Sequence, residues 1–165
     1  MISSIGKYVL IIVLLVGGVF LDLRTKQWAK DHLKGRHIVS LVPGCVELGY
    51  TENRGMVFGI FNHDSRAQKY ISGLTWVRAV ILLAVTVFIT VQRKKSLLYL
   101  LPFMLIWCGA LGNLVDVFGR GYVIDSIHIH AGKILDWPFF FNIADAYVCV
   151  GMAILLLTGI TARKN

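Results

Sequence analysis

The sequence is short of charged residues, which make up only 16% of its 165 positions, whereas hydrophobic residues make up 56%. A water-soluble domain of this length needs a larger share of polar residues to cover its core. This shortage excludes an ordinary soluble globular protein, and it indicates an integral membrane protein.

Cysteine is also scarce, and its three positions form no pairing pattern. Cys45 lies in a polar segment, whereas Cys108 and Cys149 lie inside apolar runs. Their spacing resembles neither a disulfide framework nor a zinc site. We therefore expect three unpaired thiols, no metal and no other cofactor.

Acidic residues are outnumbered by basic ones, 9 against 17, which gives a net charge of +8. The basic residues are scattered between apolar runs rather than gathered on one face, so no nucleic-acid partner is expected. Membrane topology explains them better, because cytoplasmic loops of membrane proteins are enriched in lysine and arginine.

Long apolar runs predict four membrane-spanning helices, at about residues 8–23, 71–91, 97–115 and 143–162. The first run could instead belong to a cleaved signal peptide. It ends in charged residues rather than in a cleavage motif of small residues, so we favour a retained anchor.

Four spans place the basic residues of the short loops and ends on one side of the membrane: Lys7, the cluster 93–95 and the pair 163–164. Both termini are therefore expected in the cytoplasm.

The two longer connections are expected on the outer side, at about residues 24–70 and 116–142. The first is polar and is interrupted by glycine and proline, so we expect a small folded cap with strands at 38–41 and 45–50. A short interfacial helix is expected to begin at 65–70. The predicted fold is a single all-α membrane domain, 1–165, with four transmembrane helices, a small extracytoplasmic β-rich cradle and this interfacial helix.

One charge interrupts the second span, at Arg78. An arginine at this depth either extends its side chain toward the lipid headgroups or pairs with a group inside the bundle. The position of Arg78, about a third of the way into the span, favours the first interpretation.

Two aspartates lie next to apolar runs, where a carboxylate is costly to keep. Asp125 follows an apolar, β-branched stretch, which indicates a side chain held by the fold. Asp145 ends the segment 142–145, so it either completes a capping box at the start of the fourth helix or acts in catalysis. Asn113 and Asp116 would share one helix face and form a polar network.

Asp125 and Asp145 suggest a reaction if both reach the same water molecule. Their mutual repulsion would raise one pKa, so that the pair shares one proton. The ionised member would take a proton from the attacking water, while the protonated member hydrogen-bonds the developing oxyanion. Such a pair could hydrolyse a peptide bond without a metal, a serine or a thiol.

Four blocks of the sequence together resemble the lipoprotein signal peptidase family, also called signal peptidase II. The blocks are 22–28, 53–58, 112–116 with 121–125, and 141–145. They follow the order and spacing of the family across nearly the whole chain. The resemblance implies an aspartic membrane endopeptidase that removes signal peptides from diacylglyceryl-modified prolipoproteins, cutting before the lipidated cysteine.

The resemblance also assigns roles to individual residues. Asp125 and Asp145 match the catalytic pair. The other matching positions are assigned to support of the site or to substrate contact: Asp22, Lys26, Asn53, Gly55, Asn113, Asp116 and Asn142. The expected partners are a diacylglyceryl-modified prolipoprotein and membrane lipid. The protein is expected to be a monomer in the bacterial cytoplasmic (inner) membrane, with the active site near its outer face.

One departure from the family pattern concerns an arginine. Val117 stands where the family usually has arginine after the block that ends at Asp116. We hypothesise that Arg120, three residues further on, supplies the missing guanidinium to Asp116.

Two other classes of function stay open. A metal-dependent membrane hydrolase would use His128 and His130 together with Asp125 or Asp136 as ligands. A transporter or scaffold without enzymatic activity would use its intramembrane acids as a proton or ion path. No pair of interrupted half-helices is apparent in the sequence to support the second class.

Overall fold

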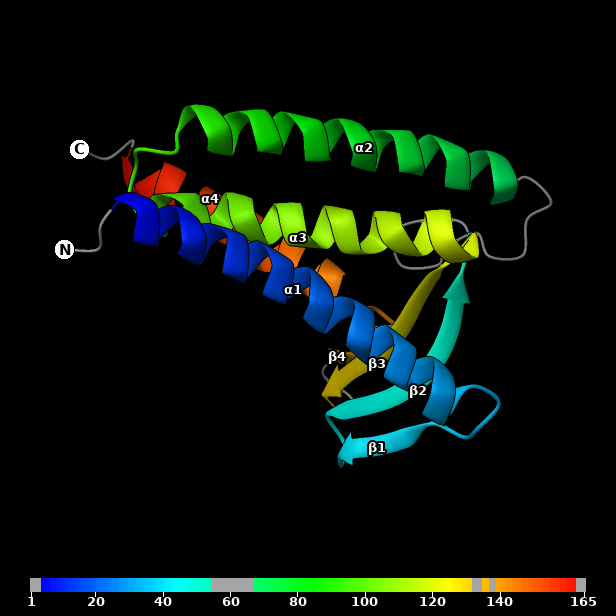
Figure 1. The fold of residues 1–165 in the computed structure, drawn as a ribbon. Coiled ribbons are helices and arrows are strands. Elements are labelled where there is room, and N and C mark those ends of the chain that lie inside the picture. Colours follow the sequence, from blue (N-terminus) through cyan, green and yellow to red (C-terminus); the bar gives the residue numbers. More distant parts are fainter. Residues whose placement is uncertain (1–3, 55–66, 132–134, 137–138, 163–165) are drawn as a thin grey trace.

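The computed structural model describes residues 4–54, 67–131, 135–136 and 139–162. In chain order the elements are α1 (Ser4–Leu33), β1 (Val39–Val42), β2 (Val46–Asn53), α2 (Ala67–Val91), α3 (Leu97–Arg120), β3 (Val123–Ala131), β4 (Leu135–Asp136) and α4 (Ile143–Ala162). The protein is mostly helical, and a small sheet lies at one end of the helices (Figure 1).

Helix α3 is the centre of the bundle, because it packs against α1, α2 and α4. Two of its glycines allow close approach. A Cβ atom added at Gly109 would collide with the backbone oxygen of Ala144 on α4, and one added at Gly112 would collide with the carboxylate of Asp22 on α1. The missing side chains therefore let α4 and Asp22 reach α3 at the level where the polar residues gather.

The outward faces of the helices are apolar. Exposed hydrophobic residues on α1, α2 and α4 include Val9, Phe20, Trp76, Leu83 and Leu156. Such faces are unfavourable in water and expected in hydrocarbon. Among the described residues, the helices Ile5–Leu33 and Leu97–Arg120 are long and apolar enough to cross a bilayer, and Thr75–Val91 and Ile143–Gly159 are shorter apolar helices. The count of four spans stays a prediction.

The start of α1 and the end of α4 lie at the end of the bundle opposite the sheet (Figure 1). The connection between α2 and α3 lies there too. Lys7 donates a hydrogen bond to the backbone oxygen of Arg93, 2.6 Å away, and another to that of Lys95. Lys7 and the cluster 93–95 are thus at one end of the described structure, as expected if that end is cytoplasmic, whereas the pair 163–164 lies outside the described residues.

The sheet is antiparallel, with the strand order β1-β2-β3-β4. The strands predicted at 38–41 and 45–50 are present as β1 and β2, with slightly different bounds. Glu47 on β2 faces His128 on β3, and Asn53 faces Val123. Strand β3 thereby joins the segment after α3 to the segment after α1.

The observed helices and strands differ in extent from three of the predicted ranges, while the membrane spans themselves stay a prediction. Helix α1 continues past 23 to Leu33, because Ala29 and Leu33 pack with Ile124 of β3 in a buried cluster. Residues 67–70 belong to α2 rather than to a separate interfacial helix, and 65–66 lie outside the described residues. The segment 116–142, predicted as an outer loop, contains the end of α3 and the strands β3 and β4.

Candidate active site

A buried lysine on α1 organises the polar interior. Lys26 and Asp22 lie one helical turn apart, and both side chains are 0% exposed. The ammonium of Lys26 is 2.8 Å from Asp22 Oδ2 and 3.2 Å from Asp116 Oδ2 on α3, and it donates to Asn113 Oδ1 at 2.9 Å. Buried charges are costly unless they are paired, so this one cation ties α1 to α3 and orients the amide of Asn113.

Asp22 connects α1 to α4 as well. Its Oδ1 accepts a hydrogen bond from the backbone N–H of Ala144, at 2.9 Å. This N–H is one of the unpaired donors at the beginning of α4. The carboxylate of α1 therefore sets the position of the first turn of α4, which carries Asp145.

Asp116 connects α3 to the sheet, because its Oδ2 accepts a hydrogen bond from the backbone N–H of Ile124 on β3, at 3.2 Å. Its Oδ1 pairs with the guanidinium of Arg120, which also donates to Gln27 Oε1 on α1 at 3.0 Å. The hypothesis that Arg120 pairs with Asp116 is confirmed. Asp116 thus lies between two cations, Lys26 and Arg120.

Asp125 lies on β3 and is only 2% exposed. Its two oxygens accept hydrogen bonds from two side-chain amides, Asn53 Nδ2 on β2 at 3.0 Å and Asn142 Nδ2 at 2.7 Å. Burial and the negative charge of Asp145 raise the pKa of Asp125 from 3.8 to about 7, although the two amide donors act in the opposite direction. Asp125 therefore keeps a proton at a pH at which an exposed aspartate has lost it.

Asp145 completes a reciprocal capping box at the start of α4. Asn142 Oδ1 accepts from the backbone N–H of Asp145 at 3.0 Å, and Asp145 Oδ2 accepts from the backbone N–H of Asn142 at 3.3 Å. The capping interpretation is confirmed. Asp145 Oδ1 is directed elsewhere, because it accepts from Asn113 Nδ2 on α3 at 2.8 Å. The capping box uses only one of the two oxygens of this carboxylate, so the geometry is compatible with a second role for Asp145.

Asn142 brings the two aspartates together. Its side-chain amide donates to Asp125, and its backbone N–H donates to Asp145. Asn142 is held in turn by Phe141, whose backbone pairs with that of Ile127 on β3. A single buried asparagine between strand and helix therefore fixes both carboxylates.

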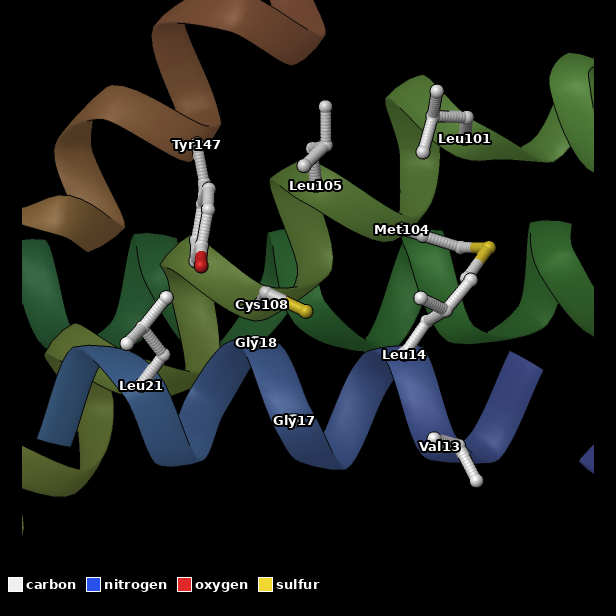
Figure 2. A pocket seen from close by; sticks show the side chains of 10 residues that line it. All are labelled: Val13, Leu14, Gly17, Gly18, Leu21, Leu101, Met104, Leu105, Cys108 and Tyr147. Carbon is white, nitrogen blue, oxygen red and sulfur yellow. The ribbon is translucent and has the colours of Figure 1, made fainter. Parts of the chain in front are cut away.

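Two cavities lie beside α3 and α4. One, of about 430 Å³, lies against α1 and is lined by apolar side chains together with Gly17, Gly18 and the aromatic ring of Tyr147 (Figure 2). None of the predicted site residues lines it. The other, of about 500 Å³, lies against α2, and Asp145 and Asn113 line it among mostly apolar side chains. A substrate in the second cavity would reach Asp145.

Arg78 on α2 lines the same cavity. The sequence favoured a side chain extending to the headgroups over one paired inside the bundle; in the structure Arg78 lines a cavity between the helices, and its charge interacts with those of Asp145 and Asp125. A lone arginine in an apolar run was the available signal, but its helix face could not be known. Gly55, the one predicted site residue not accounted for, lies outside the described residues.

The ligands of a metal-dependent hydrolase are not brought together. His128 Nδ1 and His130 Nε2 face the carboxylate of Glu47, at 3.1 Å and 3.4 Å. Side chains alternate along β3, so Asp125 points to the opposite face from both histidines, and the side chain of Asp136 lies outside the described residues. Within the described part of the chain, no group of three or more His, Cys, Asp or Glu side chains is placed to hold a metal ion.

Fold and site together define a class, a mostly helical membrane protein with two aspartates held by one asparagine, and one of the two, Asp145, lines an apolar cavity. A family model described as "Signal peptidase (SPase) II" matches residues 11–161. The chain belongs to the signal peptidase II family, and it is therefore a membrane protease.

Individual relatives cover most of the chain. It is 31% identical over 141 residues to the "Lipoprotein signal peptidase" of Blochmanniella pennsylvanica, which covers 84% of this chain and 81% of the relative. It is 33% identical over 153 residues to that of Clostridioides difficile, covering 91% and 92%. The fold is similar to a solved structure titled "Bacterial membrane enzyme structure by the in meso method at 2.3 A resolution". The TM-score is 0.74 at 26% identity, over 94% of this chain and 91% of the other.

Proposed function

We propose that this protein is an aspartic endopeptidase that removes signal peptides from diacylglyceryl-modified prolipoproteins, cleaving immediately before the lipidated cysteine. The observation that carries the proposal is the pair Asp125 and Asp145, both held by Asn142, with Asp145 lining an apolar cavity. Membership of the signal peptidase II family and the names of the relatives support the substrate class.

The reaction needs one base and one acid, and the contacts of the two aspartates differ accordingly. Asp145 lies in the first turn of α4 and accepts hydrogen bonds from Asn113 and Asn142, which stabilises a negative charge. Asp125, with its pKa raised to about 7, is the member that holds the proton near neutral pH. Asp145 is thus the base, and Asp125 is the acid.

In the first step, Asp145 accepts a proton from a water molecule while the water oxygen forms a bond to the carbonyl carbon of the scissile amide. Asp125 gives its proton to the carbonyl oxygen, which yields a neutral tetrahedral diol. In the second step, the amide nitrogen takes the proton from Asp145, the carbon–nitrogen bond breaks, and the diol returns a proton to Asp125. No bond to the enzyme is formed, and the pair ends as it began.

The position of the pair fits a substrate that arrives through the lipid. The cavity between α2, α3 and α4 is apolar along its length and polar at the end where Asn113 and Asp145 lie. An apolar signal helix or acyl chain would fill the apolar part, and the bond to be cut would lie at the polar end. In the proposed topology the protein crosses the bacterial cytoplasmic membrane four times, both termini are cytoplasmic, and the aspartate pair lies near the outer face. The protein is proposed to act as a monomer.

The test uses the purified protein in detergent with two synthetic precursors that differ only in the cysteine. We expect cleavage of the diacylglyceryl-modified precursor at a rate at least about 100-fold above that of the unmodified one, because binding of the lipid contributes to the rate. Mass spectrometry should find the lipidated cysteine at the new N-terminus, and activity should survive strong chelation. Equal cleavage of both precursors, or a cut elsewhere, would contradict the proposal.

The raised pKa of Asp125 predicts the alkaline limb of the pH profile. Burial and the charge of Asp145 disfavour the ionised form, so the acid is intact below a pH of about 7 and is lost as the pH rises through that value. We therefore expect kcat/KM to fall above pH 7.

Asn53 donates a hydrogen bond to the carboxylate of Asp125, which stabilises its ionised form. Asn53→Ala should therefore move the alkaline limb to higher pH, and a limb that moves to lower pH would contradict the assignment of Asp125 as the acid.

A further inference from the structure

Arg78 is the one charged residue of the apolar helix segment Thr75–Val91. It lines the cavity together with Asp145 and Asn113, so all three lie at the polar end of an otherwise apolar space. Its charge interacts with that of Asp145 and, more weakly, with that of Asp125. An arginine inside an apolar helix is costly and commonly marks a functional site.

Among the described residues, Arg78 has no partner closer than these aspartates. Within the part of the chain that the structure describes, its guanidinium forms no hydrogen bond and no ion pair at contact distance. A guanidinium carries five N–H donors and stays charged at all relevant pH values. Removed from water, such a group is retained only where a nearby negative charge offsets its desolvation. The two aspartates are the acids that face it.

The charges around the pair can be counted element by element. Helix α1 presents Asp22 and Lys26, α3 presents Asp116 and Arg120, α2 presents Arg78, and β2 presents the neutral Asn53. Lys26 and Arg120 are in contact with Asp22 and Asp116, so these four side chains sum to zero. Two aspartates that share one proton carry one negative charge. Among the described residues, Arg78 supplies the positive charge that balances it.

We propose that Arg78 is a positioning residue for the reaction: its guanidinium is the counter-ion of the single negative charge shared by Asp125 and Asp145, and it holds that charge on Asp145. The inference rests on the proposed function of the pair. Lys26 also acts on Asp125 from a distance, but its ammonium is engaged by Asp22 and Asp116. Arg78 acts from the opposite wall of the cavity, where no other described charge lines it.

The test compares Arg78→Met, which removes the charge and keeps an apolar stem, with Arg78→Lys, which keeps a positive charge. Arg24→Met is the matched control, because Arg24 is an exposed arginine on α1. The profiles of kcat and KM against pH are measured with the lipidated precursor.

Without the cation the anionic pair is disfavoured, so the acid limb of kcat for Arg78→Met should move to higher pH by about one unit. Well below the acid limb of the wild type, this shift lowers kcat about tenfold. KM should change less than twofold, and the lysine and Arg24→Met profiles should stay near the wild type.

A second readout does not depend on turnover. The infrared band of protonated carboxyl groups is titrated in the resting protein, and in Arg78→Met it should persist to higher pH than in the wild type. If Arg78→Met does not fold, Arg78→Gln takes its place. If neither the pH profiles nor the infrared band of Arg78→Met moves, while Asp125→Asn is inactive on the same precursor, the role of Arg78 is overturned and the proposed function stands. An active Asp125→Asn overturns both.

Discussion

Replacing either Asp125 or Asp145 with asparagine is expected to lower kcat for the lipidated precursor by about 10³-fold or more. A positioned acid or base contributes up to about 10⁴-fold, and the pair supplies both functions. Asparagine neither accepts the proton of the water nor donates a proton to the oxyanion. The double variant should lose little beyond either single variant, because the two residues act as one unit.

These substitutions should leave the fold in place. Asparagine at 145 retains an oxygen that can accept the backbone N–H of Asn142, so the capping box persists. At 125 the new amide group meets the amide donors of Asn53 and Asn142, so one hydrogen bond is lost and moderate destabilisation is expected. Thermal unfolding in detergent measures this separately from activity.

Asp31→Asn is the matched control for the aspartate variants. Asp31 is exposed on α1 and accepts a hydrogen bond from Gln27, at 2.9 Å. Its replacement removes one exposed carboxylate from a position that lines neither cavity, and activity should be unchanged. Near-normal turnover by Asp125→Asn or Asp145→Asn, with a normal Asp31→Asn, would show that the pair has been assigned wrongly.

Lys26→Met is expected to destabilise the protein by about 3–5 kcal/mol, the cost of leaving buried charges without a partner. Lys26 contacts two carboxylates, those of Asp22 and Asp116, and all three side chains are 0% exposed. Arg120 still pairs with Asp116 in the variant, so Asp22 is the acid left without a cation. The loss should appear as a lower midpoint of thermal unfolding, followed by the rise in thiol labelling above that of the exposed Cys45 and Cys149 as the buried Cys108 becomes accessible.

Activity should fall in Lys26→Met as well. The ammonium holds Asn113 Oδ1, and Asn113 Nδ2 in turn donates to Asp145, so the lysine positions the base through one asparagine. Lys34→Met is the matched control, since Lys34 forms an exposed ion pair with Glu52 at 2.8 Å. Exposed pairs contribute little, and this variant should unfold near the wild-type temperature.

A second substitution tests the cause of the loss. Adding Asp22→Asn to Lys26→Met removes the unpaired carboxylate, so part of the lost stability should return. Similar unfolding midpoints for Lys26→Met and Lys34→Met would show that the buried pair does not stabilise the fold. A double variant no more stable than Lys26→Met would show that the loss does not come from the unpaired Asp22.

Several features of the site could be predicted because they are local. The capping box at 142–145 needs only an asparagine and an aspartate three residues apart at the start of an apolar run. Likewise, Arg120 lies four residues after Asp116 on one helix, within reach of its carboxylate. Asp125 and Asp145 were identified by their place beside apolar runs and by the resemblance of the surrounding blocks to a known family.

Other features depend on contacts between distant segments. Strand β3 was missed because its partner β2 lies more than 70 residues earlier in the chain. For example, Asn53 on β2 and Asp125 on β3, which are joined by a hydrogen bond, are 72 residues apart. Lys26 and Asn113, 87 residues apart, meet only because α1 packs on α3. The direction of Arg78 was likewise undetermined, since a helix apolar on all sides carries no signal for which face meets the bundle.

The sequence by itself determined the class of the protein, since so apolar a chain can bury its surface only in lipid, and local capping determined the start of α4. The tertiary structure alone decided which polar groups of different elements meet. Each buried charge must find a counter-charge or a donor on another element, and only the packing of α1, α3, α4 and the sheet determines whether Asn142 can reach both Asp125 and Asp145.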